Sequence, residues 1–558
     1  MDFLVSQRRP KVLLVQPPVE DFYHTEARLQ PLGLAYLKSA VMANVPGADV
    51  RILDSHHRCG RRSIPLPKEL RDLRRFYPCP DNSPFGAFYT YYHFGMESGE
   101  ISSIIEKEKP DLVGISSLFS AYAKGALSVA EAIRARSAVP ILFGGAHPSA
   151  VPEQVLAHPS VSLVIRGAGE RPLVELLRRW PPADGPSRLP APSLLSQVPN
   201  LGFKEKGRAV WNPVEPNFPF GQLPVPDFSD WTPDCYSLDG RPLAMVCTSR
   251  GCPQGCRFCT VYQVFGSRVE RRPVAEQAAE ILQRFREGYR VIDFEDDHFA
   301  GNRQETLELC RRLWEELPRG ELRLVAMNGI SHWHLDAELL QWMHRAGFRS
   351  LNLSLVSADE KVCRAMGRPG SRAAFREVVC EAHRLGFQVT AYQILGLPGE
   401  PMESILDTLR LLARLPVRLG PSPFYPLPGA DLCRGRSAFS EEELTRCRLT
   451  AFSVETEDCS RAHVYTLFLT ARVINFLKGL TLKTEETPLA ELLDSADAGA
   501  GRESLGLRLL QVLLRERKLY AGGPRGMQPL PQFDADLFFR IWDDLGVVMT
   551  QNGQRLVL

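Results

Sequence analysis

The stretch Thr248-Ser-Arg-Gly-Cys252-Pro-Gln-Gly-Cys256-Arg-Phe-Cys259 follows an apolar run at 243–248 and places three cysteines within eight residues. One loop can therefore present three thiolates to a single compact inorganic centre, and soft thiolate ligands select zinc or an iron–sulfur cluster. A structural zinc site is closed by four ligands, and the neighbouring sequence offers no fourth Cys or His at a matching spacing. Because a cubane cluster held by only three cysteines keeps one iron open, the array favours a catalytic iron–sulfur cluster over a zinc knuckle.

The array stands at the start of a regular alternation of predicted strands and helices. Such an alternation predicts parallel strands joined by crossover helices, and six strand–helix units predict a partial (β/α)6 barrel with its chemistry at the carboxyl ends of the strands. The predicted strands are 243–248, 291–295, 322–327, 350–355, 388–395 and 417–424, and the predicted helices between them are 273–287, 303–316, 336–346, 373–385 and 401–414.

A second alternation precedes the array, over residues 11–175, and predicts a doubly wound, flavodoxin-like α/β domain with a parallel sheet. Ligands of such sheets bind at the carboxyl ends of the strands, and glycines there let a flat or bulky ligand approach the backbone. Each of these strand ends could also be only a tight turn, but four of them on one edge favour a binding site. The candidate ligand-contacting residues of this edge are Pro17, Pro18, Ser116, Ser117, Gly144, Gly145, His147, Gly167, Gly169 and Glu170.

Length and composition are those of an ordinary multidomain globular protein. The 558 residues carry 67 Lys and Arg against 65 Asp and Glu, a net charge of +2, which gives no electrostatic footprint for nucleic acid. The apolar run Val12–Val15 is too short for a signal peptide or a membrane-spanning helix, and the thirteen scattered cysteines do not suggest a disulfide framework, so we expect a cytoplasmic protein. We predict the doubly wound domain at 1–175, a Pro- and Ser-rich linker at 176–238, the barrel at 239–430 and a mostly helical domain at 431–558.

The array, with Phe258 before its last cysteine and on the loop after the first barrel strand, resembles the signature of the radical S-adenosylmethionine (SAM) enzymes. Together with Pro31–Leu37, Gly144–Pro148 and Arg166–Glu170 ahead of the barrel, it resembles the cobalamin-binding subclass of that family, and in particular its methylases. The resemblance implies a [4Fe–4S] cluster on the three cysteines, with SAM chelated at the open iron, and cobalamin on the doubly wound domain. A flavodoxin-type sheet could instead hold a nucleotide or flavin, but no Gly-x-Gly-x-x-Gly follows the first strand.

The resemblance also marks candidate SAM-binding residues in the barrel. Phe294-Glu-Asp-Asp297 ends the second strand, where the family places the residues that hold the methionine amino group, although these acids could also cap the following turn. Relatives commonly carry a Glu for the ribose hydroxyls near Val356, which cannot do that, so Ser354 or Ser357 is the substitute. The segment Gly396-Leu-Pro-Gly399 resembles the adenine-side loop. The candidate SAM-binding residues are Phe258, Tyr262, Glu295, Asp296, Asp297, Ser354, Ser357, Gly396 and Gly399.

A histidine ligand for cobalt is not evident in the sequence. Many cobalamin domains carry an Asp-x-His-x-x-Gly motif after the first strand, and the corresponding loop here reads Asp21-Phe-Tyr-His24. The near match Asp54-Ser-His56-His57-Arg-Cys-Gly60 follows the second strand instead. We therefore predict methylcobalamin whose cobalt has no axial histidine from this chain.

The resemblance implies a radical methyltransferase: reductive cleavage of SAM, hydrogen abstraction from an unactivated carbon by the 5′-deoxyadenosyl radical, and transfer of the methyl group of methylcobalamin. It also implies an electron donor such as flavodoxin or ferredoxin, and a small-molecule substrate such as a natural-product intermediate, a tetrapyrrole or a lipid. Two alternatives stay open: a cobalamin-dependent radical enzyme that closes a ring or oxidises its substrate, and a non-catalytic cobalamin- or metal-binding sensor. The three-cysteine array argues against the sensor, because a sensor does not require an open iron.

Overall fold

The computed structural model describes residues 10–23, 29–181, 189–480, 489–494, 501–545, 547–549 and 555–557. Its contacts divide the chain into two compact units. Unit 1 comprises Met1–Ile64, Tyr91–Asp297 and Leu427–Thr445, and unit 2 comprises Pro65–Thr90, His298–Pro426 and Arg446–Leu558. The predicted barrel therefore contributes strands to both units.

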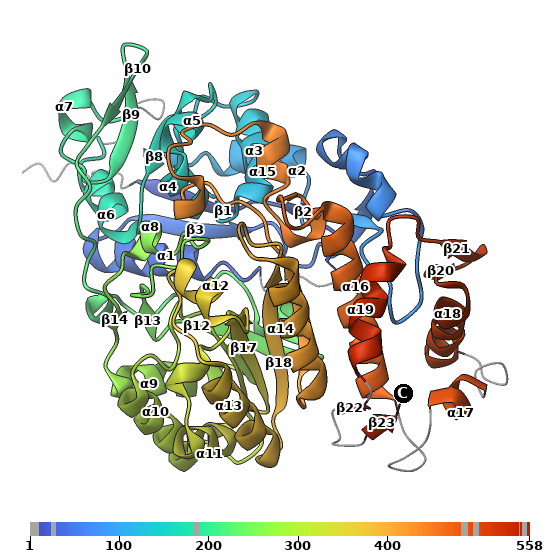
Figure 1. Ribbon diagram of the computed structural model, residues 1–558. Helices are drawn as coiled ribbons and strands as arrows, with labels where there is room; N and C mark the ends of the chain where they lie inside the picture. Colours follow the sequence, from blue (N-terminus) through green and yellow to red (C-terminus); the bar gives the residue numbers. More distant parts are fainter. Residues whose placement is uncertain are drawn as a thin grey trace, which may run out of the picture. The chain divides into compact units, whose positions relative to one another are not determined.

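Unit 1 is built on a seven-stranded sheet in the order β10-β9-β8-β7-β6-β1-β3 (Figure 1). Its central strands are nearly continuous apolar runs, as expected where helices cover both faces of a sheet. Strands β3, β1, β6, β7 and β8 are parallel in that order, which is the flavodoxin-like order and confirms the predicted fold class. The seven strands are β1 (Lys11–Gln16), β3 (Asp49–Asp54), β6 (Leu112–Ser116), β7 (Ile141–Gly144), β8 (Leu163–Ile165), β9 (Leu201–Glu205) and β10 (Arg208–Trp211).

The topological switch point of this sheet lies between β1 and β6. The chain leaves β1 toward β3 on one side and returns later on the other side as β6, so the connections diverge and open a crevice beyond the carboxyl ends of these two strands. Helix α1 (Leu32–Asn44) packs against α6 (Glu170–Arg178), and α2 (Ser98–Glu108) packs against α3 (Ala123–Arg134).

The segment between the doubly wound sheet and the barrel is structured. Strands β9 and β10, within the predicted linker, form an antiparallel hairpin that extends the sheet beyond β8. A small antiparallel sheet in the order β2-β5-β4 adds to unit 1. The remaining elements of this part are β2 (Val19–Asp21), β4 (Arg61–Ile64), β5 (Tyr91–Phe94), the single-turn helix η2 (Ser120–Tyr122), α4 (Ala146–Ala150), α5 (Pro152–Ala157), α7 (Pro192–Leu195) and η4 (Pro233–Cys235).

The first two barrel strands belong to unit 1. Strand β12 (Arg241–Val246) pairs in parallel with β15 (Val291–Phe294) and in antiparallel fashion with the short β11 (Ser237–Leu238). The two-residue strands β13 (Ser249–Arg250) and β14 (Glu270–Arg271) pair across the segment that contains the cysteine array. Along the chain, helix α8 (Tyr262–Phe265) lies between β13 and β14, and helix α9 (Val274–Arg286) lies between β14 and β15.

The other four barrel strands and their helices belong to unit 2. Strands β17, β18 and β19 form a parallel three-stranded sheet, so all six predicted strands are present. The bounds are α10 (Arg303–Glu316), β16 (Arg323–Val325), η5 (His332–His334), α11 (Ala337–Ala346), β17 (Ser350–Val356), α12 (Glu360–Ala365), α13 (Arg372–Arg384), β18 (Gln388–Leu395), α14 (Met402–Arg414) and β19 (Arg418–Pro423).

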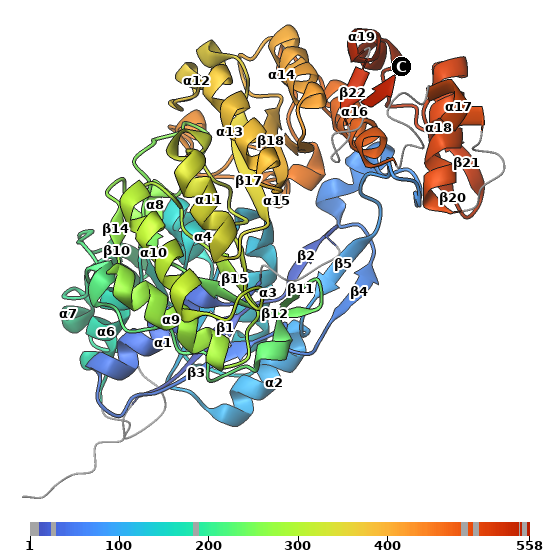
Figure 2. The same ribbon diagram turned by 90° about the horizontal axis from the view of Figure 1, so that it is seen from below.

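The C-terminal part of unit 2 is mostly helical, as predicted, with two added hairpins. Lys478 of α16 is buried, and its Nζ donates to the carbonyls of Leu412, Leu415 and Val417 at 2.7, 2.6 and 2.8 Å, which ties α16 to the end of α14. In Figures 1 and 2, α18 lies between α17 and the hairpin of β20 and β21. The elements of this part are α16 (Arg461–Gly479), α17 (Leu489–Asp494), α18 (Arg502–Glu516), β20 (Tyr520–Gly523), β21 (Gly526–Pro529), α19 (Ala535–Leu545), β22 (Val547–Met549) and β23 (Arg555–Val557). The earlier segment of unit 2 contains η1 (Lys68–Phe76).

Among the helices that the structure describes, none combines the length and the apolar character that a membrane crossing requires.

Candidate active site

The three cysteines of the array lie on one loop between β13 and α8. Cys256 is buried, at 7% exposed, and burial raises the pKa of Cys259 to about 11, with Cys256 and Cys252 adding to the rise. The three thiols are therefore close enough that each thiolate makes the ionisation of the others less favourable. A cationic iron–sulfur centre bound here would neutralise the three thiolates. Within the described ranges, no group of three His, Cys, Asp or Glu side chains is arranged to hold a single metal ion.

Gly251 fixes the start of this cysteine loop. Its φ is +88°, and a Cβ at this position would lie 2.3 Å from the backbone oxygen of Arg268, so both the conformation and the space require glycine. The Gly251 N–H donates to Asp297 Oδ2 at 2.9 Å. Burial raises the pKa of Asp297 to about 6. Asp297, one of the predicted SAM-binding residues, thus faces the backbone next to Cys252.

The neighbouring Asp296 ties the ends of the first two barrel strands together. It is 1% exposed and accepts hydrogen bonds from the Thr248 N–H at 3.0 Å and from the hydroxyls of Thr248 and Ser249, both at 2.5 Å. Both of its carboxylate oxygens therefore have protein donors. Glu295, in contrast, is partly exposed.

A second segment holds the cysteine loop from the other side, and we call residues 427–434 the strap. The Leu432 N–H donates to the carbonyl of Arg257 at 3.0 Å, and the guanidinium of Arg257 pairs with Asp431 at 2.9 Å. The Gln263 amide donates to the Gly429 carbonyl at 2.5 Å, and the Tyr262 hydroxyl donates to the same carbonyl at 3.3 Å. Tyr262, predicted near SAM, thus bonds the strap.

The strap continues into the core of the doubly wound domain. Cys433, Phe439 and Leu444 are buried in the same apolar cluster as Val155 and Phe143 of that domain. Helix α15 (Glu441–Thr445) ends this segment. The cysteine loop and the doubly wound sheet are therefore linked by one continuous piece of chain. The sequence signals this link only weakly, because turn residues such as Pro428-Gly429 do not indicate their partners.

A buried ion pair makes a second link between the cysteine loop and the doubly wound sheet. Arg250, two residues before Cys252, donates to Glu170 Oε1 at 2.7 Å, and Asn217 donates to Glu170 Oε2 at 2.7 Å. The Arg250 guanidinium also lies over the rings of Tyr36 and Phe220, at 4.4 and 4.6 Å from their centroids. Glu170, predicted to contact the ligand of the sheet, thus has both carboxylate oxygens engaged by protein donors.

The Glu170→Gln substitution is expected to lower the free energy of unfolding by about 3 kcal/mol, because it leaves the buried Arg250 charge uncompensated. The matched control is Glu175→Gln on the same helix, whose partly exposed pairs with Arg178 and Arg179 contribute at most about 1 kcal/mol. Urea unfolding of both variants measures the difference. Equal midpoints, together with an altered spectrum of bound cobalamin in the Glu170 variant alone, would favour a ligand contact instead.

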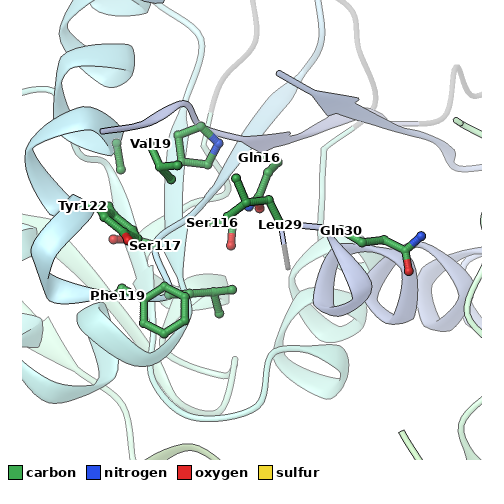
Figure 3. Close-up of a pocket in the computed structure, with 11 residues that line it drawn as sticks. Gln16, Val19, Leu29, Gln30, Ser116, Ser117, Phe119 and Tyr122 are labelled. Carbon is green, nitrogen blue, oxygen red and sulfur yellow. The ribbon is translucent and has the colours of Figure 1, made fainter. Parts of the chain in front are cut away.

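The open edge of the doubly wound sheet carries a pocket at its switch point. The cavity volume is about 40 Å³, so the hollow can receive part of a ligand at the edge of the sheet and does not enclose a whole cofactor. Leu118 and Phe119, which follow β6, are 49% and 58% exposed. Large exposed apolar side chains beside a hollow indicate a binding surface. The lining residues, several of them shown in Figure 3, are Gln16, Pro17, Val19, Leu29, Gln30, Ser116, Ser117, Leu118, Phe119, Tyr122 and Ala126.

Three of the ten residues predicted for this edge, Pro17, Ser116 and Ser117, line the pocket. The turn after β7 instead supports the Ser117 loop. The Ser117 N–H donates to the Gly144 carbonyl at 2.8 Å, and the His147 N–H donates to the Ser117 carbonyl at 3.1 Å. Burial lowers the pKa of His147 to about 4, so its imidazole is neutral. The other predicted residues outside the lining are Pro18, Gly145, Gly167, Gly169 and Glu170.

Apolar loop residues were missed by the sequence analysis. Leu118, Phe119 and Tyr122 follow the predicted Ser116-Ser117 turn directly, and their position after a central strand is the signal that could have included them. Tyr122 is oriented by its hydroxyl, which donates to the buried Asp21 at 2.7 Å.

Two histidines near the doubly wound sheet are engaged by other groups. His56 is buried, and its Nε2 lies 3.1 Å from the carbonyl of Pro17. His57 Nδ1 lies 3.0 Å from the sulfur of Cys235. His24 lies outside the described residues.

Strand β17 of unit 2 ends in a strained turn at the position where the sequence departs from the family pattern. Val356 has a φ of +74°, which a β-branched residue rarely adopts, and the pairing with β18 shifts register between Ser354 and Val356. Ser357 is buried and donates to Glu400 Oε1 at 2.7 Å. Ser354 is partly exposed. Among the described residues, its hydroxyl has no buried carboxylate partner of the kind that Ser357 has in Glu400.

The turn after β18 brings its backbone close to helix α16. Gly396 and Gly399 have φ values of +81° and +76°, and a Cβ at Gly396 would lie 3.1 Å from Val464. Burial raises the pKa of Glu400 to about 7, so this carboxyl group is partly protonated at neutral pH.

Two family models match the chain: the radical SAM superfamily over residues 246–412 and the B12 binding domain over residues 89–177. The chain is 25% identical over 428 residues to an uncharacterized methyltransferase of Pyrococcus horikoshii, a match that covers 76% of this chain and 82% of the relative. It is 26% identical over 491 residues to cytidylyl-2-hydroxyethylphosphonate methyltransferase of Streptomyces wedmorensis, covering 80% of this chain and 85% of the relative.

A solved structure shares the fold. The radical S-adenosylmethionine methyltransferase TsrM from Kitasatospora setae, with cobalamin and a [4Fe-4S] cluster bound, matches with a TM-score of 0.61 at 16% identity, over 91% of this chain and 99% of that chain. The radical SAM match begins at the end of β12, before the cysteine loop, and the B12 match covers β6, β7 and β8. Both matches therefore coincide with the two places where the structure carries a candidate site.

Proposed function

We propose that this chain is a cobalamin-dependent radical SAM methylase and that it transfers a methyl group to an unactivated carbon of a small-molecule substrate. One observation carries the proposal. Within unit 1, the Arg250–Glu170 pair and the strap join the loop of three cysteines to the doubly wound sheet, which has a pocket at its switch point. An enzyme that uses an iron–sulfur cluster and cobalamin in one reaction must hold the two binding sites at a fixed distance and orientation.

The chain's own residues bind and orient the cofactors in this proposal. Cys252, Cys256 and Cys259 hold the [4Fe–4S] cluster, and Gly251 and Asp297 keep their loop in place. When bound, the cluster, SAM and cobalamin supply the reductive cleavage and the methyl carrier.

Carboxylates near the cysteine loop are the partners for the methionine ammonium group. Glu295 and Asp297 are the proposed residues, while Asp296 positions the strand ends that carry them. Phe258 and Ser354, with the turn of Gly396 and Gly399, are the proposed contacts to the rest of SAM.

The switch-point pocket is the proposed cobalamin site. Pro17, Ser116 and Ser117 supply backbone and hydroxyl groups, and the exposed Leu118 and Phe119 supply apolar surface for the corrin ring and exclude water from it. The small-molecule substrate is supported by the relative from Streptomyces wedmorensis, which is named for methylation of a small phosphonate. Flavodoxin or ferredoxin is the proposed electron donor.

The test is an anaerobic assay of the reconstituted protein with hydroxocobalamin, SAM and a low-potential reductant, in which methylcobalamin and 5′-deoxyadenosine are followed together. The formation of both products is expected. If 5′-deoxyadenosine forms while bound cobalamin is never methylated, the chain is a non-methylating radical enzyme such as a cyclase. If neither product forms while both cofactors are bound, the chain is a binding protein.

Cobalt bound to this chain is expected to lack an axial histidine, because His56 and His57 already bond Pro17 and Cys235. The substitutions His24→Ala and His57→Ala should leave the absorption spectrum of bound cobalamin unchanged. A large spectral shift in either variant contradicts the prediction.

A further inference from the structure

A thiol and an imidazole meet on the surface of unit 1, away from the cysteine array. The sulfur of Cys235, at the end of η4, lies 3.0 Å from Nδ1 of His57, which is hydrogen-bond distance. Both side chains are half-buried, so a small reagent can reach them. The Thr232 hydroxyl lies 3.4 Å from the same sulfur.

The pair is held in place by buried groups. Asp54, at the end of β3, accepts the His56 N–H on Oδ1 at 3.0 Å and the Tyr236 hydroxyl on Oδ2 at 2.6 Å. His56 and Tyr236 are the chain neighbours of His57 and Cys235, and both are buried. The Asp54 carboxylate therefore holds both backbone segments that carry the pair, so the fold itself brings Cys235 and His57 together.

Charged side chains flank the thiol–imidazole pair. Asp234 lies beside His57: the pKa of Asp234 is lowered first by its hydrogen bond from Thr232, and His57 also contributes to the lowering. Arg58 lies 3.8 Å from Asp234. A cysteine whose thiol can pass its proton to a neighbouring base becomes a nucleophile as its thiolate.

We infer that Cys235 and His57 form a reactive thiol site that takes up low-molecular-weight disulfides as mixed disulfides. The Cys235 proton passes to His57 Nδ1, and the thiolate attacks one sulfur of the disulfide. A new S–S bond forms at Cys235 as the S–S bond of the reagent breaks. The second half of the reagent leaves as a thiolate with the electron pair and takes up a proton, so no external oxidant is needed.

The inference is independent of the proposed catalytic function, because neither residue belongs to the cluster loop or the switch-point pocket. Its control is Cys380 on α13, which is exposed and forms no hydrogen bond with an imidazole among the described residues, and whose helical neighbour His383 is replaced by Gln in all proteins compared. Exposure alone therefore predicts that Cys380 reacts at least as fast as Cys235, whereas the pairing with His57 predicts the opposite order.

The test labels the full-length, cluster-loaded protein under anaerobic conditions at neutral pH with limiting iodoacetamide, and separately with oxidised glutathione, and reads each cysteine by peptide mass spectrometry. Cys235 is expected to react about tenfold faster than Cys380 with both reagents. The His57→Gln variant, which keeps a hydrogen-bonding side chain but no base, should lower the Cys235 rate to that of Cys380.

Equal rates at Cys235 and Cys380 in the protein that retains His57 overturn the inference, as does an unchanged Cys235 rate in His57→Gln. The labelling of buried cysteines such as Cys310 and Cys433 in each variant reports whether the protein has stayed folded, because unfolding exposes them and raises their labelling together.

Discussion

The Cys256→Ala variant is expected to bind cobalamin and to release no 5′-deoxyadenosine. Cys256 is the buried member of the cysteine loop, and two thiolates cannot hold a cubane cluster that requires at least three. The rate of SAM cleavage should therefore fall below about a thousandth of that of the unsubstituted protein, a barrier increase of about 4 kcal/mol or more. Cobalamin binding should persist, because the switch-point pocket contains no residue of this loop.

Three measurements on this variant check the prediction: iron and sulfide content, cobalamin retained after gel filtration, and 5′-deoxyadenosine by mass spectrometry. The matched control is Cys380→Ala, which removes an exposed thiol from α13 and should keep all three values. SAM cleavage that continues in the Cys256 variant with cobalamin bound would falsify the assignment of the cluster to this loop.

The Gly251→Ala variant is expected to lose the cluster although it removes no ligand. A Cβ at this position would meet the Arg268 backbone oxygen at 2.3 Å, and backbone cannot move aside as a flexible side chain can. The cost of strain and displacement is expected to exceed about 3 kcal/mol. The shift would also break the bond from the Gly251 N–H to Asp297 and move Cys252 away from the other two thiols.

Gly255 provides the matched control for this substitution. It lies in the same loop with a φ of +61°, but a Cβ there would meet nothing within 4 Å, so Gly255→Ala carries only the conformational cost of about 1 kcal/mol. Iron content per chain after reconstitution is the measurement, and it should drop to background in Gly251→Ala and stay near that of the unsubstituted protein in Gly255→Ala. Similar iron contents in the two variants would mean that the collision does not occur.

The fold could be predicted because its signals are local. The apolar runs Val12–Val15 and 243–246 correspond to β1 and β12, since a buried parallel strand is typically a short continuous apolar stretch. The cysteine array was also readable from spacing alone. The exposed Phe119 was not, because a single aromatic residue in a loop has no periodicity that separates a ligand contact from ordinary packing.

The contacts that hold the candidate site are long-range, and this is why the sequence does not reveal them. Glu170 and Arg250 are 80 residues apart, and Arg257 and Asp431 are 174 residues apart. Each of these charged residues reads alone as a solvated surface residue. The positive φ of Val356 could not be predicted from the sequence either. Valine disfavours this conformation, and only the surrounding structure imposes it.

The buried Arg250–Glu170 pair has a consequence for how this chain can be divided or recombined. A fragment that starts after the doubly wound sheet would keep Arg250 over the ring of Phe220. It would lose the counter-charge of Glu170, at a cost of about 3 kcal/mol or more out of a total stability of about 5–15 kcal/mol. The two cofactor regions are therefore not interchangeable modules. A chimera that grafts a different cobalamin domain onto this barrel should fold only if the graft brings an acid to the place of Glu170, and heat should melt the two regions in a single step.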